Sequence, residues 1–201
     1  MRRRPQSLLH ILLGQEAIYL VMAASLFAAL TFAILFVRER AVSRQMQQPP
    51  IIMLEESKGY FFRSGYADLT PEFKQLLTER IVPVLLDNSE RYGASIVEVI
   101  GHTDEQPVGA SGRSTMDSAL LVFLNGQSEV PPAVADNVGL GMSRAAAVSI
   151  ALKRDPRLSA LTILSLSAGQ TITEGDTLAA PGGAAIEQTR RRIEIRLRRP
   201  T

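Results

Sequence analysis

Two adjacent carboxylates, Asp104 and Glu105, follow a short β-branched run at residues 94–100 and are the first candidates for chemistry in this sequence. General acid–base catalysis needs carboxyl groups that face the same space, whereas neighbouring residues at a strand end point apart. Other catalytic patterns, G-x-S-x-G, G-x-x-x-x-G-K, H-E-x-x-H and G-x-G-x-x-G after a strand, do not occur. We therefore expect no enzymatic activity.

Composition excludes several further classes of site. The chain has no cysteine and 2 histidines, which excludes disulfides, thiolate metal sites and a histidine-built zinc site. The formal charge is +2, and residues 38–201 carry 19 basic and 19 acidic side chains. A neutral body argues against a nucleic-acid partner, which would select a basic face. We expect neither a metal nor any other cofactor.

Two segments share a pattern with a known family. Residues 101–107 read GHTDEQP and residues 137–145 read NVGLGMSRA. They resemble the two signature pieces of the OmpA-like peptidoglycan-binding domain, G-[HY]-T-D and N-x-x-L-[SG]-x-x-R-A. YFFRSGYADLTP at residues 60–71 resembles the first strand and first helix start of that family, and RRRIEIRL at residues 190–197 resembles its last strand. The resemblance covers roughly residues 51–198.

The resemblance implies a ligand and two residues that hold it. The family, which includes OmpA, Pal and MotB, has a βαβαβ fold and binds the peptide stem of peptidoglycan without catalysis. Its signature Asp and Arg hold the diaminopimelate of the stem, and they correspond here to Asp104 and Arg144. Diaminopimelate offers an ammonium and a carboxylate, which a carboxylate and a guanidinium complement in charge and geometry. The alternative for these two residues is a structural salt bridge.

Three other residues of the signatures are candidates for the same site. Thr103 and Asn137 would position the loop and add hydrogen bonds, while Leu140 would pack beneath the ligand. Each also has a structural interpretation: a strand-end turn for Thr103, a helix N-cap for Asn137 and the core for Leu140.

The arginine-rich last strand departs from the family pattern. Arg190 stands where the family often has Asn, which leaves Arg191 and Arg192 as candidates for the groove, and we include Arg192 in the predicted site. A solvated strand face is the alternative for these arginines. His102 is expected to pack rather than to contact ligand.

The elements that must position these residues follow from hydrophobic periodicity. We predict an α+β fold of the OmpA-like βαβαβ type, a sandwich in which helices cover one face of a mixed sheet. Thr70-Pro71-Glu72 has the order of a helix start, and Pro83 predicts a kink. The predicted strands are residues 51–54 with 60–62, 94–100, 161–167 and 192–198, and the predicted helices are 70–88 and 143–152.

A single transmembrane helix precedes this domain. Residues 17–37 contain 21 residues without a charge, which is enough to span a hydrocarbon core of about 30 Å. The predicted parts are a short cytoplasmic N-terminus at 1–16, the helix at 17–37, a linker at 38–50, and an OmpA-like domain at 51–199 with an insert at 108–136. Because peptidoglycan is periplasmic, we expect a single-pass inner-membrane protein with its C-terminal domain in the periplasm.

The plan of one helix and one wall-binding domain resembles MotB-type stator subunits and leaves three functions open. The first is a non-enzymatic anchor that tethers a membrane complex to peptidoglycan. The second is a stator subunit, a homodimer with a MotA/TolQ-like partner, in which Glu16 carries protons; MotB-type helices carry an Asp within the membrane, and this helix has none. The third is a scaffold that has lost wall binding and binds a protein through its insert. If Glu16 does not carry protons, we expect it to lie at the membrane interface, among the lipid headgroups.

Overall fold

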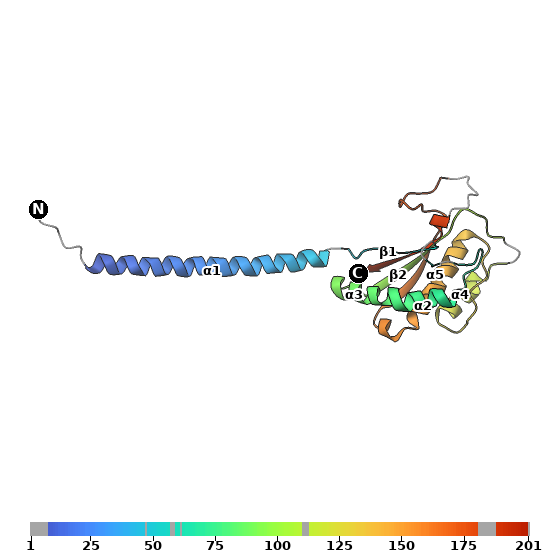
Figure 1. Ribbon diagram of the computed structural model, residues 1–201, viewed down its shortest axis with the longest axis horizontal. Helices are drawn as coiled ribbons and strands as arrows, with labels where there is room; N and C mark the ends of the chain where they lie inside the picture. Colours follow the sequence, from blue (N-terminus) through green and yellow to red (C-terminus); the bar gives the residue numbers. More distant parts are fainter. Residues whose placement is uncertain are drawn as a thin grey trace, which may run out of the picture. The chain divides into compact units, whose positions relative to one another are not determined.

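The computed structural model describes residues 8–46, 48–56, 59–60, 62–109, 113–180 and 188–200 (Figure 1). The chain divides into two compact units, residues 1–47 and 48–201. The first contains helix α1 (Leu8–Met46), in which Glu16–Arg40 is long and apolar enough to cross a membrane. The helix continues beyond the apolar run, so residues 38–46 of the predicted linker are helical. Most of these polar residues are good helix formers, and Pro49-Pro50 follows the helix.

The second unit is built on a four-stranded mixed sheet in the order β1-β4-β2-β3. Its strands are β1 (Ile52–Glu55), β2 (Ile96–His102), β3 (Thr162–Gly169) and β4 (Arg192–Arg198). β2 and β3 are parallel, whereas β4 runs antiparallel to both β1 and β2. The predicted α+β class, with a mixed sheet and helices, is confirmed.

The helices cover one face of this sheet. The core joins alternate residues of the strands, such as Val97, Val99 and Ile195, to Phe73, Leu85 and other helix residues. The intervening strand residues lie on the opposite face, where Leu164 and Leu166 are partly exposed and Glu194 is buried. Period-two alternation therefore decides which side chains can reach a site formed between the sheet and its helices.

The first helical region begins as predicted and contains a local irregularity. α2 (Pro71–Leu76) is capped by Thr70, whose Oγ1 accepts a 3.1 Å hydrogen bond from the Phe73 N–H. A π-helical turn, η2 (Leu77–Ile81), separates it from α3 (Val82–Tyr92). The turn comes just before Pro83, which has no N–H to donate and whose ring crowds the preceding turn.

The aromatic segment before α2 is not the second strand that its residues predict. Tyr60 and Phe62 lie outside any strand and pack edge-to-face against Phe73, with ring centroids 5.3 and 5.2 Å apart. Aromatic residues are common in strands, but here their large rings are buried in the core and the segment does not pair in the sheet. This packing holds the segment against the helices, where its next residues reach the site.

The insert and the second signature form the remaining helices. The apolar run of the insert is helix α4 (Met116–Leu124), whose Phe123 packs on Ala146 and Ile150 of α5. Helix α5 (Asn137–Lys153) begins before the predicted residue 143. The sequence pattern indicated a later start because Gly139 and Gly141 lower the helix propensity of its first turns. The N-cap is Asp136, so the alternative interpretation of Asn137 as an N-cap is wrong.

Candidate functional site

Two glycines, one from each signature, allow the strand and the helix that carry the site to touch. A Cβ atom added at Gly101 in β2 would lie 1.9 Å from the carbonyl oxygen of Gly141 in α5. A Cβ added at Gly141 would lie 2.5 Å from the Ser167 Oγ and 2.7 Å from the Gly101 oxygen. These distances are far below van der Waals contact. The absence of side chains at these positions therefore brings the end of β2 and the start of α5 together.

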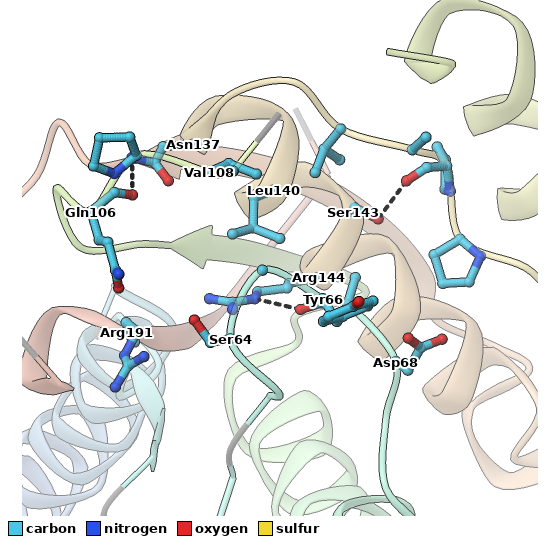
Figure 2. A pocket seen from close by; sticks show the side chains of 18 of the residues that line it. Ser64, Tyr66, Asp68, Gln106, Val108, Asn137, Leu140, Ser143, Arg144 and Arg191 are labelled. Atoms are coloured by element: carbon cyan, nitrogen blue, oxygen red, sulfur yellow. Dashed lines mark hydrogen bonds between the residues drawn. The ribbon is translucent and has the colours of Figure 1, made fainter. Parts of the chain in front are cut away.

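An open cavity of about 740 Å³ lies beside this contact (Figure 2). Its walls come from residues 64–68 before α2, residues 106–109 after β2, the insert, and one side of α5. Four predicted site residues line it: Asp104, Asn137, Leu140 and Arg144. Thr103 and Arg192 do not.

One oxygen of the Asp104 carboxylate lacks a hydrogen-bond donor among the described residues. The residue is 5% exposed, and its buried Oδ2 has no hydrogen-bond partner among the described residues. The Nε of Arg191 is 3.8 Å from this oxygen, which is ion-pair distance without a hydrogen bond. A buried carboxylate oxygen without a donor is unfavourable unless a ligand supplies one.

Arg144 presents a buried guanidinium at the same cavity. It is 3% exposed, and its Nε donates a 3.1 Å hydrogen bond to the Tyr66 carbonyl (Figure 2). Its guanidinium carbon lies 4.9 Å from the centre of the Phe62 ring. Burial, and next the charge of Arg191, lower its pKa to about 10, so it is charged at neutral pH. Among the described residues no carboxylate forms an ion pair with it, so the direct Asp104–Arg144 salt bridge is not found.

Arg191, rather than Arg192, is the arginine that reaches the cavity from the last strand. The Arg191 Nε lies 2.9 Å from the Glu56 Oε2 and also faces Asp104. Arg192 is buried on the other side of β4, where its Nη2 donates a 3.1 Å hydrogen bond to the Thr173 carbonyl. Because Ile193 packs in the core beneath the helices, the alternation of a strand turns Arg192 away from them.

The loop that carries Asp104 is held by contacts on both sides. The backbone N–H of Thr103 donates to the Gly169 carbonyl at 2.8 Å, whereas its buried Oγ1 has no partner among the described residues. The Nδ2 of Asn137 donates to the Gln106 carbonyl at 3.1 Å. The backbone of Thr103 and the side chain of Asn137 therefore hold the loop.

Arg190 also holds this loop. Its Nη1 lies 2.7 Å from the Glu105 Oε1, and its Nη2 donates to the Gln170 carbonyl. It therefore links the loop after β2 to the loop after β3, and it does not line the cavity. Sequence spacing alone did not reveal this role, because Glu105 and Arg190 lie 85 positions apart.

His102 lies outside the cavity, in a buried pair. Its Nε2 is 3.0 Å from the Glu194 Oε2, and both side chains are almost fully buried. The hydrogen bond from His102, assisted by one from Arg196, lowers the pKa of Glu194 to about 2. His102 therefore supports the end of β2 from the far face of the sheet.

Solved structures provide the comparisons for this chain. The periplasmic domain of Helicobacter pylori MotB is 17% identical, with 78% of this chain and 80% of that one covered and a TM-score of 0.49. A putative MotB-like protein from Desulfovibrio vulgaris is 18% identical, with 75% of each chain covered and a TM-score of 0.39.

The OmpA-like domain of FopA1 from Francisella tularensis is 15% identical, with 75% of each chain covered and a TM-score of 0.36. No protein-family model and no curated protein matches the sequence. The similarities concern the fold, and the chemistry of the site rests on the geometry of this chain.

Proposed function

We propose that this protein is a non-enzymatic anchor that ties a membrane complex to peptidoglycan by binding the diaminopimelate of the stem peptide. One observation carries the proposal. Asp104, whose buried Oδ2 accepts no hydrogen bond among the described residues, and Arg144, whose buried guanidinium forms no ion pair with any of those residues, line the same cavity. A ligand with one ammonium and one carboxylate satisfies both groups.

Each charged residue has its own role in this proposal. The Asp104 carboxylate accepts hydrogen bonds from the ligand ammonium. The Arg144 guanidinium, oriented by the Tyr66 carbonyl and the Phe62 ring, donates its remaining N–H groups to the ligand carboxylate. Arg191 adds positive charge beside them. Because the protein already holds these groups out of water, binding requires little reorganisation.

The membrane helix sets the location that we propose. α1 contains one segment, Glu16–Arg40, that can cross a bilayer. Peptidoglycan lies in the periplasm, so the function places residues 48–201 there and makes the chain a single-pass inner-membrane protein.

Sedimentation with isolated peptidoglycan tests the proposal. The full chain in detergent is mixed with diaminopimelate-type peptidoglycan and pelleted, beside Asp104→Asn and Arg144→Gln. Wild type should pellet and both variants should stay in the supernatant. Asp87→Asn, which removes one partner of the exposed Asp87–Arg91 pair, is the charge-matched control and should pellet. A wild-type protein that remains soluble, with its fold verified by circular dichroism, overturns the proposal.

A second candidate function is a stator subunit, in which a homodimer joins a MotA/TolQ-like channel protein and Glu16 carries protons. The position of Glu16 favours it, because this acid begins the segment that can span the membrane. Glu16→Gln in cells should abolish proton-dependent activity while peptidoglycan binding persists. Unchanged activity contradicts this function and leaves the anchor intact.

A further inference from the structure

The cavity has two chemically different halves. Asp104, Arg144 and Arg191 form the charged half described above. The insert supplies an opposite wall, consisting of Val108, Arg113 and residues 130–134. This second half presents mainly apolar side chains and one arginine.

The insert wall is held in place by hydrogen bonds. The Thr115 N–H donates to the Ala133 carbonyl at 3.0 Å, and the Ala133 N–H donates to the Thr115 Oγ1 at 2.9 Å. The Ser143 Oγ, from α5, donates to the Pro132 carbonyl at 3.4 Å (Figure 2). Pro131 and Pro132 further restrict the backbone. The wall is therefore formed before a ligand arrives.

The wall suits small alkyl groups and a carboxylate. Its side chains are valines, prolines and an alanine, and Arg113 is exposed and forms no ion pair among the described residues. A peptide that ends in small residues and a free carboxylate matches these features.

The size of the cavity agrees with a longer peptide. Sites that enclose a ligand of drug size have volumes of about 300–1,000 Å³. A volume of about 740 Å³ lies in the upper part of that range. It exceeds the need of a single amino-acid side chain, so residues next to diaminopimelate also have room.

We infer that the insert wall is a second subsite, which binds the D-alanine residues that follow diaminopimelate in the stem peptide. Their methyl groups lie against the valines and prolines, and the terminal carboxylate pairs with Arg113. The inference rests on the proposed function and extends it, since it names the part of the stem that the site distinguishes.

Calorimetry with soluble stem peptides tests the subsite. The full chain in detergent is titrated with a tripeptide that ends at diaminopimelate and with the tetrapeptide and pentapeptide that add one and two D-alanines. Each buried methyl group should tighten binding about fourfold. The pentapeptide should therefore bind at least about fourfold more tightly than the tripeptide.

Two variants assign this preference to the wall. Arg113→Gln should weaken pentapeptide binding and leave tripeptide binding unchanged, whereas Arg80→Gln, at an exposed arginine outside the cavity, should change neither. Val130→Asp, at a position 73% exposed, should reduce the preference by repelling the terminal carboxylate without disturbing the core. Equal binding of all three peptides, or a preference that survives both variants, overturns the subsite and spares the proposed function. Failure of every peptide to bind overturns both.

Discussion

The close contact between Gly101 and Gly141 gives the sharpest test of how this fold builds its site. On backbone grounds alone, Gly101→Ala in strand β2 should stabilise the protein by about 0.5–1 kcal/mol, because glycine loses more entropy on folding. The added Cβ would, however, meet the Gly141 carbonyl oxygen at 1.9 Å, and that oxygen belongs to the backbone of a buried helix. Helix α5 must move away from the sheet.

The magnitude follows from these opposing effects. Forcing an extra methyl group into a packed region costs about 1–3 kcal/mol, and a clash with backbone belongs at the upper end. Subtracting the entropic gain leaves a destabilisation of about 2 kcal/mol. For a chain of this size, the melting temperature should fall by about 4–8 °C. Arg144, carried by α5, should move relative to Asp104, so peptidoglycan binding should weaken as well.

Thermal unfolding by circular dichroism and peptidoglycan sedimentation together measure the effect. Gly175→Ala is the control, because a Cβ there meets nothing within 4 Å, and it should change stability by less than about 0.5 kcal/mol. A Gly101→Ala protein that is as stable as wild type and pellets normally would refute the argument that this contact aligns the two signatures.

Two further predictions concern the groups that support the site. Glu194 has a pKa of about 2 in the folded protein against 4.5 in the unfolded chain, so its contribution to stability is present above pH 4.5 and is lost as the pH falls through 2. Urea unfolding between pH 2 and pH 5 should therefore show a steeper loss of stability on acidification for wild type than for Glu194→Gln, and parallel profiles would contradict this. The second prediction concerns the ion pair of Glu105 with Arg190, which is largely buried. A double-mutant cycle of Glu105→Gln and Arg190→Gln, measured by urea unfolding, should give a coupling energy of about 1–3 kcal/mol. If the two substitutions change the free energy of unfolding additively, the pair does not hold the loop.

Local sequence determines much of this protein. The uncharged run at residues 17–37 requires a helix that satisfies its own backbone in lipid, and α1 contains it. Thr70 and Pro71 begin a helix because a hydroxyl can cap it and proline suits its first position. Period-two alternation in residues 192–198 predicts β4, whose apolar residues pack in the core, although Arg192 and Glu194 on its other face are buried as well. Asp104 and Arg144, one from each signature, both line the cavity.

Only the tertiary structure decided which other residues join them. Arg191 and Arg192 are chemically identical neighbours, but Arg191, just before β4, lines the cavity, whereas Arg192 lies on the face of β4 away from the helices. The pair of Glu105 with Arg190 and the wall of the insert both depend on segments far apart in the chain. Local propensity acts over a few residues, whereas these contacts arise when Gly101 and Gly141 let the helix dock on the sheet. The sequence therefore determines the charges available for binding, and long-range packing determines the space in which they act.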